Sequence, residues 1–199
     1  MNYLKIMFKG IFTSNPVFVL ALGLCSTLAV TGRADTAFFM GVMVGITTIF
    51  STVIVSALRY KIPFKFRLMS YMLIIITAVI SVEQLLRAYY PDMARTLGQY
   101  VGLIVTNCVI MGRCEGFAVS HGPKETFFDA MGVSIGYFLV LLSIAFFRET
   151  LGNGTLWGLH VMPGSYVPCR VFNSPSGAFL TFAAMLYFVN LVKGWFKGE

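Results

Sequence analysis

The chain has 199 residues, of which 57% are hydrophobic and only 12% are charged. Soluble domains carry about twice that share of charged residues, so the composition excludes an ordinary soluble enzyme and indicates a single all-α membrane domain, residues 1–199. The net charge of +7 does not indicate a nucleic-acid partner, because the basic residues stand at the ends of apolar segments, as in chains that cross a lipid bilayer.

Six apolar segments follow one another and predict six transmembrane segments. A full helical span needs about 20 residues, and four segments approach that length. The first and fourth are shorter and rich in small and polar residues, which favours half-helices or broken helices that meet inside the membrane. The segments are 16–31, 36–58, 68–86, 97–112, 127–147 and 177–195.

The two short segments open two halves of three segments each, approximately residues 10–90 and 95–197. An odd number of spans places the second half in the opposite orientation, so the sequence predicts two inverted three-helix repeats. The longest connection, from Glu149 to Ser176, carries several Gly and Pro residues and predicts turns rather than helix on the outer side.

Lysine and arginine are distributed unevenly between the two sides that six spans would create. The richer side is expected to face the cytoplasm, which places both termini there. That side holds Lys5, Lys9, Arg59, Lys61, Lys65, Arg67, Arg113, Lys124, Lys193 and Lys197, and the other holds Arg33, Arg87, Arg95, Arg148 and Arg170.

Two of the four cysteines, Cys25 and Cys108, lie in the two short segments. A lone buried cysteine usually behaves as a small apolar residue, but two in matching settings favour thiolate ligation of iron, with a disulfide as the alternative. Iron-sulfur clusters commonly take four cysteine ligands, so two more would come from a second chain. We expect Cys114 and Cys169 to lie outside this chemistry.

Three polar residues are further candidates for the site or for an ion path. Asn107 precedes Cys108 and can donate a hydrogen bond to a cluster sulfur or to the backbone of a broken helix. Glu83 lies inside the third segment, where an ionisable side chain is a functional candidate, although Arg87 one turn later also suggests an interfacial pair. Glu115 lies at the predicted cytoplasmic edge.

Two pairs of neighbouring charges close the fourth and fifth segments. Arg113 and Glu115 follow one, and Arg148 and Glu149 follow the other. Such pairs are most simply interfacial and of little energetic weight, and gating of an ion is the alternative.

Six short stretches, in three regions of the chain, resemble the RnfE/NqrD family of membrane proteins. The first segment is similar in NPVFVL, LGLC and TLAVT, the fourth in GLIVTNCVIMGR, and the end of the fifth in RE followed by LGNGTL. These stretches are residues 15–20, 22–25, 27–31, 102–113, 148–149 and 151–156.

The resemblance implies a six-span subunit of an ion-translocating (Na⁺ or H⁺) redox complex in a prokaryotic cytoplasmic (inner) membrane. It implies a homologous partner of inverted topology, RnfA or NqrE, and one [2Fe-2S] cluster shared at the membrane centre. Cys25 and Cys108 would be this chain's ligands. Electrons would pass between the cytoplasmic side and a flavin-bearing subunit, so the chain would belong to an oxidoreductase without holding a complete active site.

The resemblance points to two complexes. The Rnf complex, a ferredoxin:NAD oxidoreductase, is the first expectation because Phe8-Lys9-Gly10-Ile11 and Asn153-Gly154-Thr155 are more similar to RnfE. The alternative is NqrD, from the Nqr complex, an NADH:quinone oxidoreductase, to which Ser26 is more similar. A secondary transporter or channel without a redox role is the more remote alternative.

Overall fold

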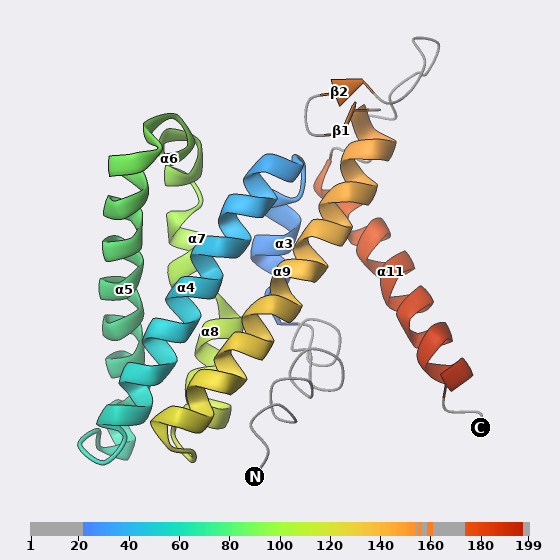
Figure 1. Cartoon of the computed structure of the whole chain (residues 1–199). Coiled ribbons are helices and arrows are strands. Elements are labelled where there is room, and N and C mark those ends of the chain that lie inside the picture. Colours follow the sequence, from blue (N-terminus) through green and yellow to red (C-terminus); the bar gives the residue numbers. More distant parts are fainter. Residues whose placement is uncertain (1–21, 154, 157–158, 161–173, 197–199) are drawn as a thin grey trace.

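Helices make up almost all of the described part of the computed structural model, which comprises residues 22–153, 155–156, 159–160 and 174–196 (Figure 1). Two short strands form the rest of its regular structure. The elements are α3 (Leu24–Val30), α4 (Ala34–Leu58), η2 (Phe64–Phe66), α5 (Arg67–Tyr89), α6 (Pro91–Gly98), α7 (Val101–Val105), α8 (Cys108–Arg113), the π-helical turn η3 (Cys114–Ala118), α9 (Pro123–Asn153), β1 (Thr155–Leu156), β2 (Leu159–His160) and α11 (Pro175–Phe196).

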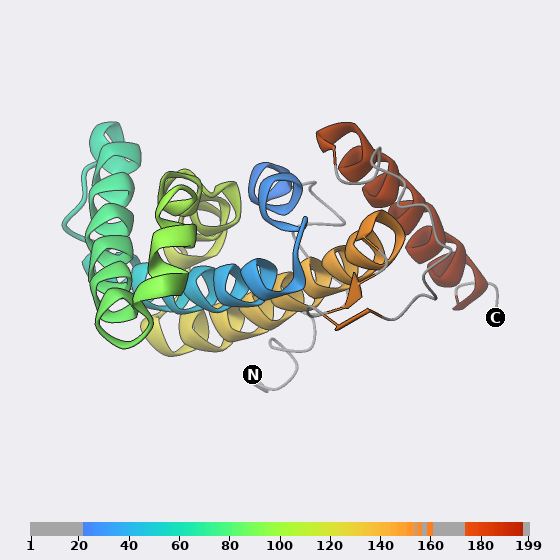
Figure 2. The same ribbon diagram turned by 90° about the horizontal axis from the view of Figure 1, so that it is seen from above.

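The long helices α4 and α9 lie side by side and form the base of the molecule (Figures 1 and 2). Two glycines on α4 allow this close approach. A Cβ atom on Gly41 would stand 2.6 Å from Cδ2 of Phe138, and the hydroxyl of Ser134 donates a hydrogen bond of 3.3 Å to the carbonyl oxygen of Gly45. The Gly-x-x-x-Gly spacing therefore serves packing within the chain.

The remaining helices stand on one side of this base (Figure 2). α3 and the α7–α8 segment lie in the middle, and α5 and α11 stand at its two ends. Large apolar side chains on both outer helices are exposed, among them Leu73 and Leu180. A molecule with so much exposed apolar surface needs a bilayer or other subunits around it.

Four helical stretches are long and apolar enough to cross a membrane: Ala34–Leu58, Arg67–Tyr89, Val101–Ala118 and Pro123–Thr150. The chain is therefore an integral membrane protein. The predicted segments 36–58 and 68–86 coincide with α4 and α5, and 177–195 coincides with α11, whose described apolar stretch, Ser176–Val189, is shorter.

One of the two predicted short segments, the fourth, is interrupted in the described part of the chain. Of segment 16–31, residues 16–21 lie outside the described part, and the rest holds only the seven-residue α3. Segment 97–112 is broken into α7 and α8 at Thr106 and Asn107, and then continues through η3 to Ala118. The short helix α6 was not expected.

The predicted boundary after residue 147 is wrong. Helix α9 continues through Glu149 to Asn153, and β1 and β2 then form a two-stranded antiparallel hairpin. The helix continues past its two charges because both are satisfied inside the protein, as described below. Residues 161–173 of the predicted outer connection lie outside the described part.

Candidate metal centre

The first turns of α3 and α8 meet inside the molecule. The backbone N–H of Gly23, the residue before α3, donates a hydrogen bond of 2.8 Å to Sγ of Cys108, the first residue of α8. In Figure 1, α3 rises from this junction and α8 descends from it, so the two helices leave it in opposite directions. The fold thus brings two segments 85 residues apart to a common point beside a thiol.

Both cysteines of the predicted pair lie at this junction. Cys25 is the second residue of α3 and is exposed, whereas Cys108 is half-buried. The start of a helix presents unpaired N–H groups and the positive end of the helix dipole, which favours negative charge such as a thiolate. The exposure of Cys25 leaves its sulfur accessible from outside this chain.

The junction depends on a glycine. Gly23 has a φ of +82°, in the left-handed region that favours glycine. A Cβ atom at this position would stand 2.8 Å from Cγ2 of Val109 and 3.0 Å from Cε2 of Tyr137. A side chain at residue 23 would therefore separate α3 from α8 and remove the N–H from the sulfur of Cys108.

Asn107 lies at the break between α7 and α8, but its hydrogen bond to the backbone runs in the opposite direction from the expected one. Its side-chain oxygen accepts a hydrogen bond of 3.0 Å from the N–H of Val109 and so caps α8. Its Nδ2 atom lies 3.4 Å from the hydroxyl oxygen of Ser26 on α3. Asn107 is completely buried. Through these two contacts it connects the start of α8 to the first turn of α3.

The donors at the junction fit half of a thiolate-ligated site. Among the described residues, no group of three or more His, Cys, Asp or Glu side chains could hold a metal ion. Two sulfur atoms remain, and soft thiolate donors suit iron-sulfur clusters, zinc and copper(I). A four-ligand centre here would need two ligands from another chain.

The third described cysteine differs from these two. Cys114 lies in η3, and its side chain is fully buried, so it packs as a small apolar group. Cys169 lies outside the described residues.

The two candidate carboxylates lie in ion pairs. Glu83 accepts a hydrogen bond of 2.6 Å from Arg87 one helical turn later. Glu115, half-exposed, lies 4.0 Å from Arg67 of α5. Arg113 lies 3.6 Å from Asp129 of α9, a cross-helix pair that the sequence did not indicate.

Arg148 and Glu149 were expected as an interfacial pair, which is wrong because both are buried, with 4% and 5% of their surface exposed. Arg148 donates hydrogen bonds to the carbonyl oxygen of Leu28, at 3.2 Å, and to the hydroxyl of Thr31, at 2.6 Å. Glu149 accepts a hydrogen bond of 2.8 Å from the N–H of Ala34, the first residue of α4. These side chains serve the helix ends on either side of the α3–α4 turn.

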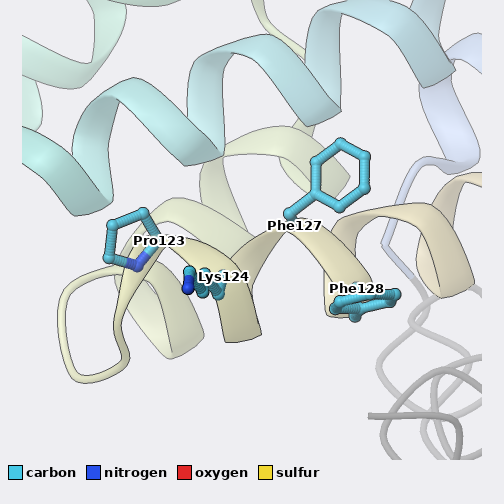
Figure 3. A pocket seen from close by; sticks show the side chains of 4 residues that line it. All are labelled: Pro123, Lys124, Phe127 and Phe128. Atoms are coloured by element: carbon cyan, nitrogen blue, oxygen red, sulfur yellow. The ribbon is translucent and has the colours of Figure 1, made fainter.

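The described part of the chain also has a shallow hollow of about 470 Å³ at the start of α9. Figure 3 shows its lining, Pro123, Lys124, Phe127 and Phe128, all from the first turns of that helix. The described residues that line it include no thiol or carboxylate, and it lies away from the α3–α8 junction, so it is not part of the candidate metal centre.

Comparison of the sequence with known proteins identifies relatives of this chain. Residues 3–186 match the family described as the Rnf-Nqr subunit, a membrane protein. The chain belongs to the Rnf-Nqr family. The match covers nearly the whole chain, including α3, α8 and the cysteines in their first turns.

Relatives within the Rnf-Nqr family come from two kinds of complex. The chain is 39% identical to the D subunit of the Na⁺-translocating NADH-quinone reductase of Photobacterium profundum, over 95% of this chain and 92% of the relative. It is also 39% identical to the E subunit of the Na⁺-translocating ferredoxin:NAD⁺ oxidoreductase complex of Acetobacterium woodii, over 96% of this chain and 97% of the relative. Identity to the D subunit of the reductase from Haemophilus ducreyi is 42% over 81% of this chain and 78% of the relative.

These Rnf-Nqr relatives are membrane subunits of sodium-translocating oxidoreductase complexes. Equal identity to relatives from the two complexes means that overall similarity does not separate them. The family assignment predicted from the cysteine-bearing segments is therefore confirmed.

Proposed function

We propose that this chain is an electron-transfer subunit of a sodium-translocating redox complex, and that Cys25 and Cys108 supply half of the ligands of a [2Fe-2S] cluster shared with a second subunit. One observation carries the proposal: the contact between the Gly23 N–H and the Cys108 sulfur, which unites the two cysteine-bearing helix starts. Sodium is the proposed ion because the relatives from both complexes translocate it.

The proposed partner is a homologous subunit of inverted topology. The exposed thiol of Cys25 and the two-ligand limit of this chain support a second chain facing the junction. A cluster bound there would accept and release one electron. The chain's own residues would position two thiolates, donate an N–H to one sulfur and exclude water with the surrounding apolar side chains.

The proposed topology is six spans in two inverted repeats, with both termini in the cytoplasm of a prokaryotic cell. The opposite directions of α3 and α8 from their junction support it (Figure 1). The connection from α4 to α5, residues 59–66, also supports it, because this segment is rich in lysine and arginine and lies at the same end of the molecule as the start of α9 (Figure 1).

The RnfE role in an Rnf complex remains the first choice, and the NqrD role in an Nqr complex is the alternative. Reduction of the purified complex by ferredoxin or by NADH separates them. The other proposed neighbours are flavin-bearing subunits, as the resemblance to the RnfE/NqrD family implies.

Iron content of the purified complex tests the proposed ligands. Cys25→Ala and Cys108→Ala should each remove two iron atoms per complex, together with the corresponding paramagnetic signal, because each variant lacks one of the four thiolates that would hold the cluster. Cys114→Ala is the matched control and should retain both. Full iron content and electron transfer in the first two variants would refute the proposal, and would favour a transporter or a purely structural subunit.

A further inference from the structure

A buried tyrosine packs against the start of α3, next to the candidate metal centre. Tyr137 is on α9 and only 1% of its surface is exposed. Its hydroxyl oxygen lies 2.6 Å from that of Ser26 in the first turn of α3. A buried phenol normally requires a hydrogen-bond partner, and here that partner lies next to Cys25 in the sequence.

Ser26 connects Tyr137 to both helix starts. Its hydroxyl lies 3.0 Å from the carbonyl oxygen of Gly23, to which it can donate. In the hydrogen bond between Ser26 and Tyr137 either hydroxyl can donate, and Ser26 also accepts from Nδ2 of Asn107. Ser26 thus has hydrogen-bond partners on α9, at the start of α8 and at the residue before α3.

The ring of Tyr137 also limits the position of α3. A Cβ atom on Gly23 would stand 3.0 Å from ring atom Cε2, so the ring packs against the backbone at this residue. The same residue donates its N–H to Cys108. Tyr137 therefore contacts Gly23 directly through its ring and indirectly through Ser26, while Asn107 extends the network to the cap of α8.

We propose that Tyr137 is a positioning residue for the thiolate pair: it fixes the start of α3 so that the Gly23 N–H stays directed at the Cys108 sulfur. As far as it concerns a cluster, this inference rests on the proposed function. Hydrogen bonds to sulfur help to set the reduction potential of iron-sulfur clusters. A donor stabilises the more negative, reduced form, so its loss lowers the potential.

The variants Tyr137→Phe and Ser26→Ala test this role in the purified complex. Both should shift the potential of the Cys25–Cys108 centre to more negative values, and loss of iron to a chelator should become about ten-fold faster, the lower end of the range for outer-shell partners. Tyr71→Phe is the matched control, because Tyr71 is equally buried but on α5. It should leave both quantities unchanged.

A second readout does not depend on a cluster. In the iron-free complex, peptide-resolved alkylation should modify Cys108 several-fold faster in Tyr137→Phe and Ser26→Ala than in the unmodified protein or Tyr71→Phe. An unchanged potential and an unchanged alkylation rate in both variants would overturn the inference. Iron that is independent of Cys25 and Cys108 would instead refute the proposed function, and the alkylation rates would still decide the role of Tyr137.

Discussion

The two ends of α3 are both held by α9, but by different chemistry. At the start, beside the thiols, the contacts are neutral: Tyr137 bonds to Ser26 and packs on Gly23. At the end, the guanidinium of Arg148 bonds to the carbonyl oxygen of Leu28 and the hydroxyl of Thr31. A cation suits the carbonyl end of a helix, whereas neutral groups at the start hold the backbone without adding a full charge beside two potential thiolates.

Loss of the charged contacts at the end of α3 is expected to lower stability the most. Arg148→Met should destabilise the folded chain by about 3 kcal/mol, because removal of a buried charged donor leaves its acceptors unsatisfied. The fraction of chain recovered in the assembled complex and its thermal midpoint measure this effect. Arg148→Lys keeps the charge but not the planar donor geometry. Its thermal midpoint should lie between those of the unmodified chain and Arg148→Met. Equal recovery of Arg148→Met and the unmodified chain would show that this end needs no charge.

At the start of α3, where the contacts are neutral, one added methyl group should lower the stability of the folded chain. Gly23→Ala combines a left-handed backbone with close approaches to Val109 and Tyr137, which should cost about 2 kcal/mol and release iron from the complex. Gly102→Ala is the control, because a Cβ there meets no atom within 4 Å. Thermal unfolding and iron analysis of the two variants give the comparison, and equal stability would contradict the proposed close packing at the junction.

A smaller effect is expected at the cap of α8. Asn107→Ala removes the acceptor for the Val109 N–H and should cost about 1 kcal/mol. Asn107→Ser restores a capping oxygen without the amide that reaches Ser26. If capping is the main contribution, Asn107→Ser should recover most of the lost thermal stability. If the contact with α3 matters more, it should resemble Asn107→Ala.

Much of this architecture could be predicted from segment lengths and cysteine positions. The shortness of the first and fourth segments indicated interrupted helices, and the structure breaks the fourth at Asn107. The position of Cys114 just past a segment end set it apart from Cys25 and Cys108, and its side chain is buried in η3. The break in the fourth segment could be predicted because a membrane span needs a minimum length, and the length of an apolar segment can be read from the sequence.

The rest depended on contacts between distant residues. Arg148 and Glu149 looked like the end of a span, because sequence shows the charges and not the Ala34 N–H or Leu28 carbonyl that they bind. Tyr137 looked like one aromatic among many in an apolar helix. Its single clue was a polar hydroxyl in a segment where a buried phenol needs a partner, and the partner lies 111 residues away.

The position of iron in the intact complex tests the central claim most directly. Anomalous scattering recorded at the iron edge should place one cluster against the sulfurs of Cys25 and Cys108, at the junction of α3 and α8, with its other ligands from a second subunit. Iron found only at other sites of a fully assembled, active complex would contradict the account.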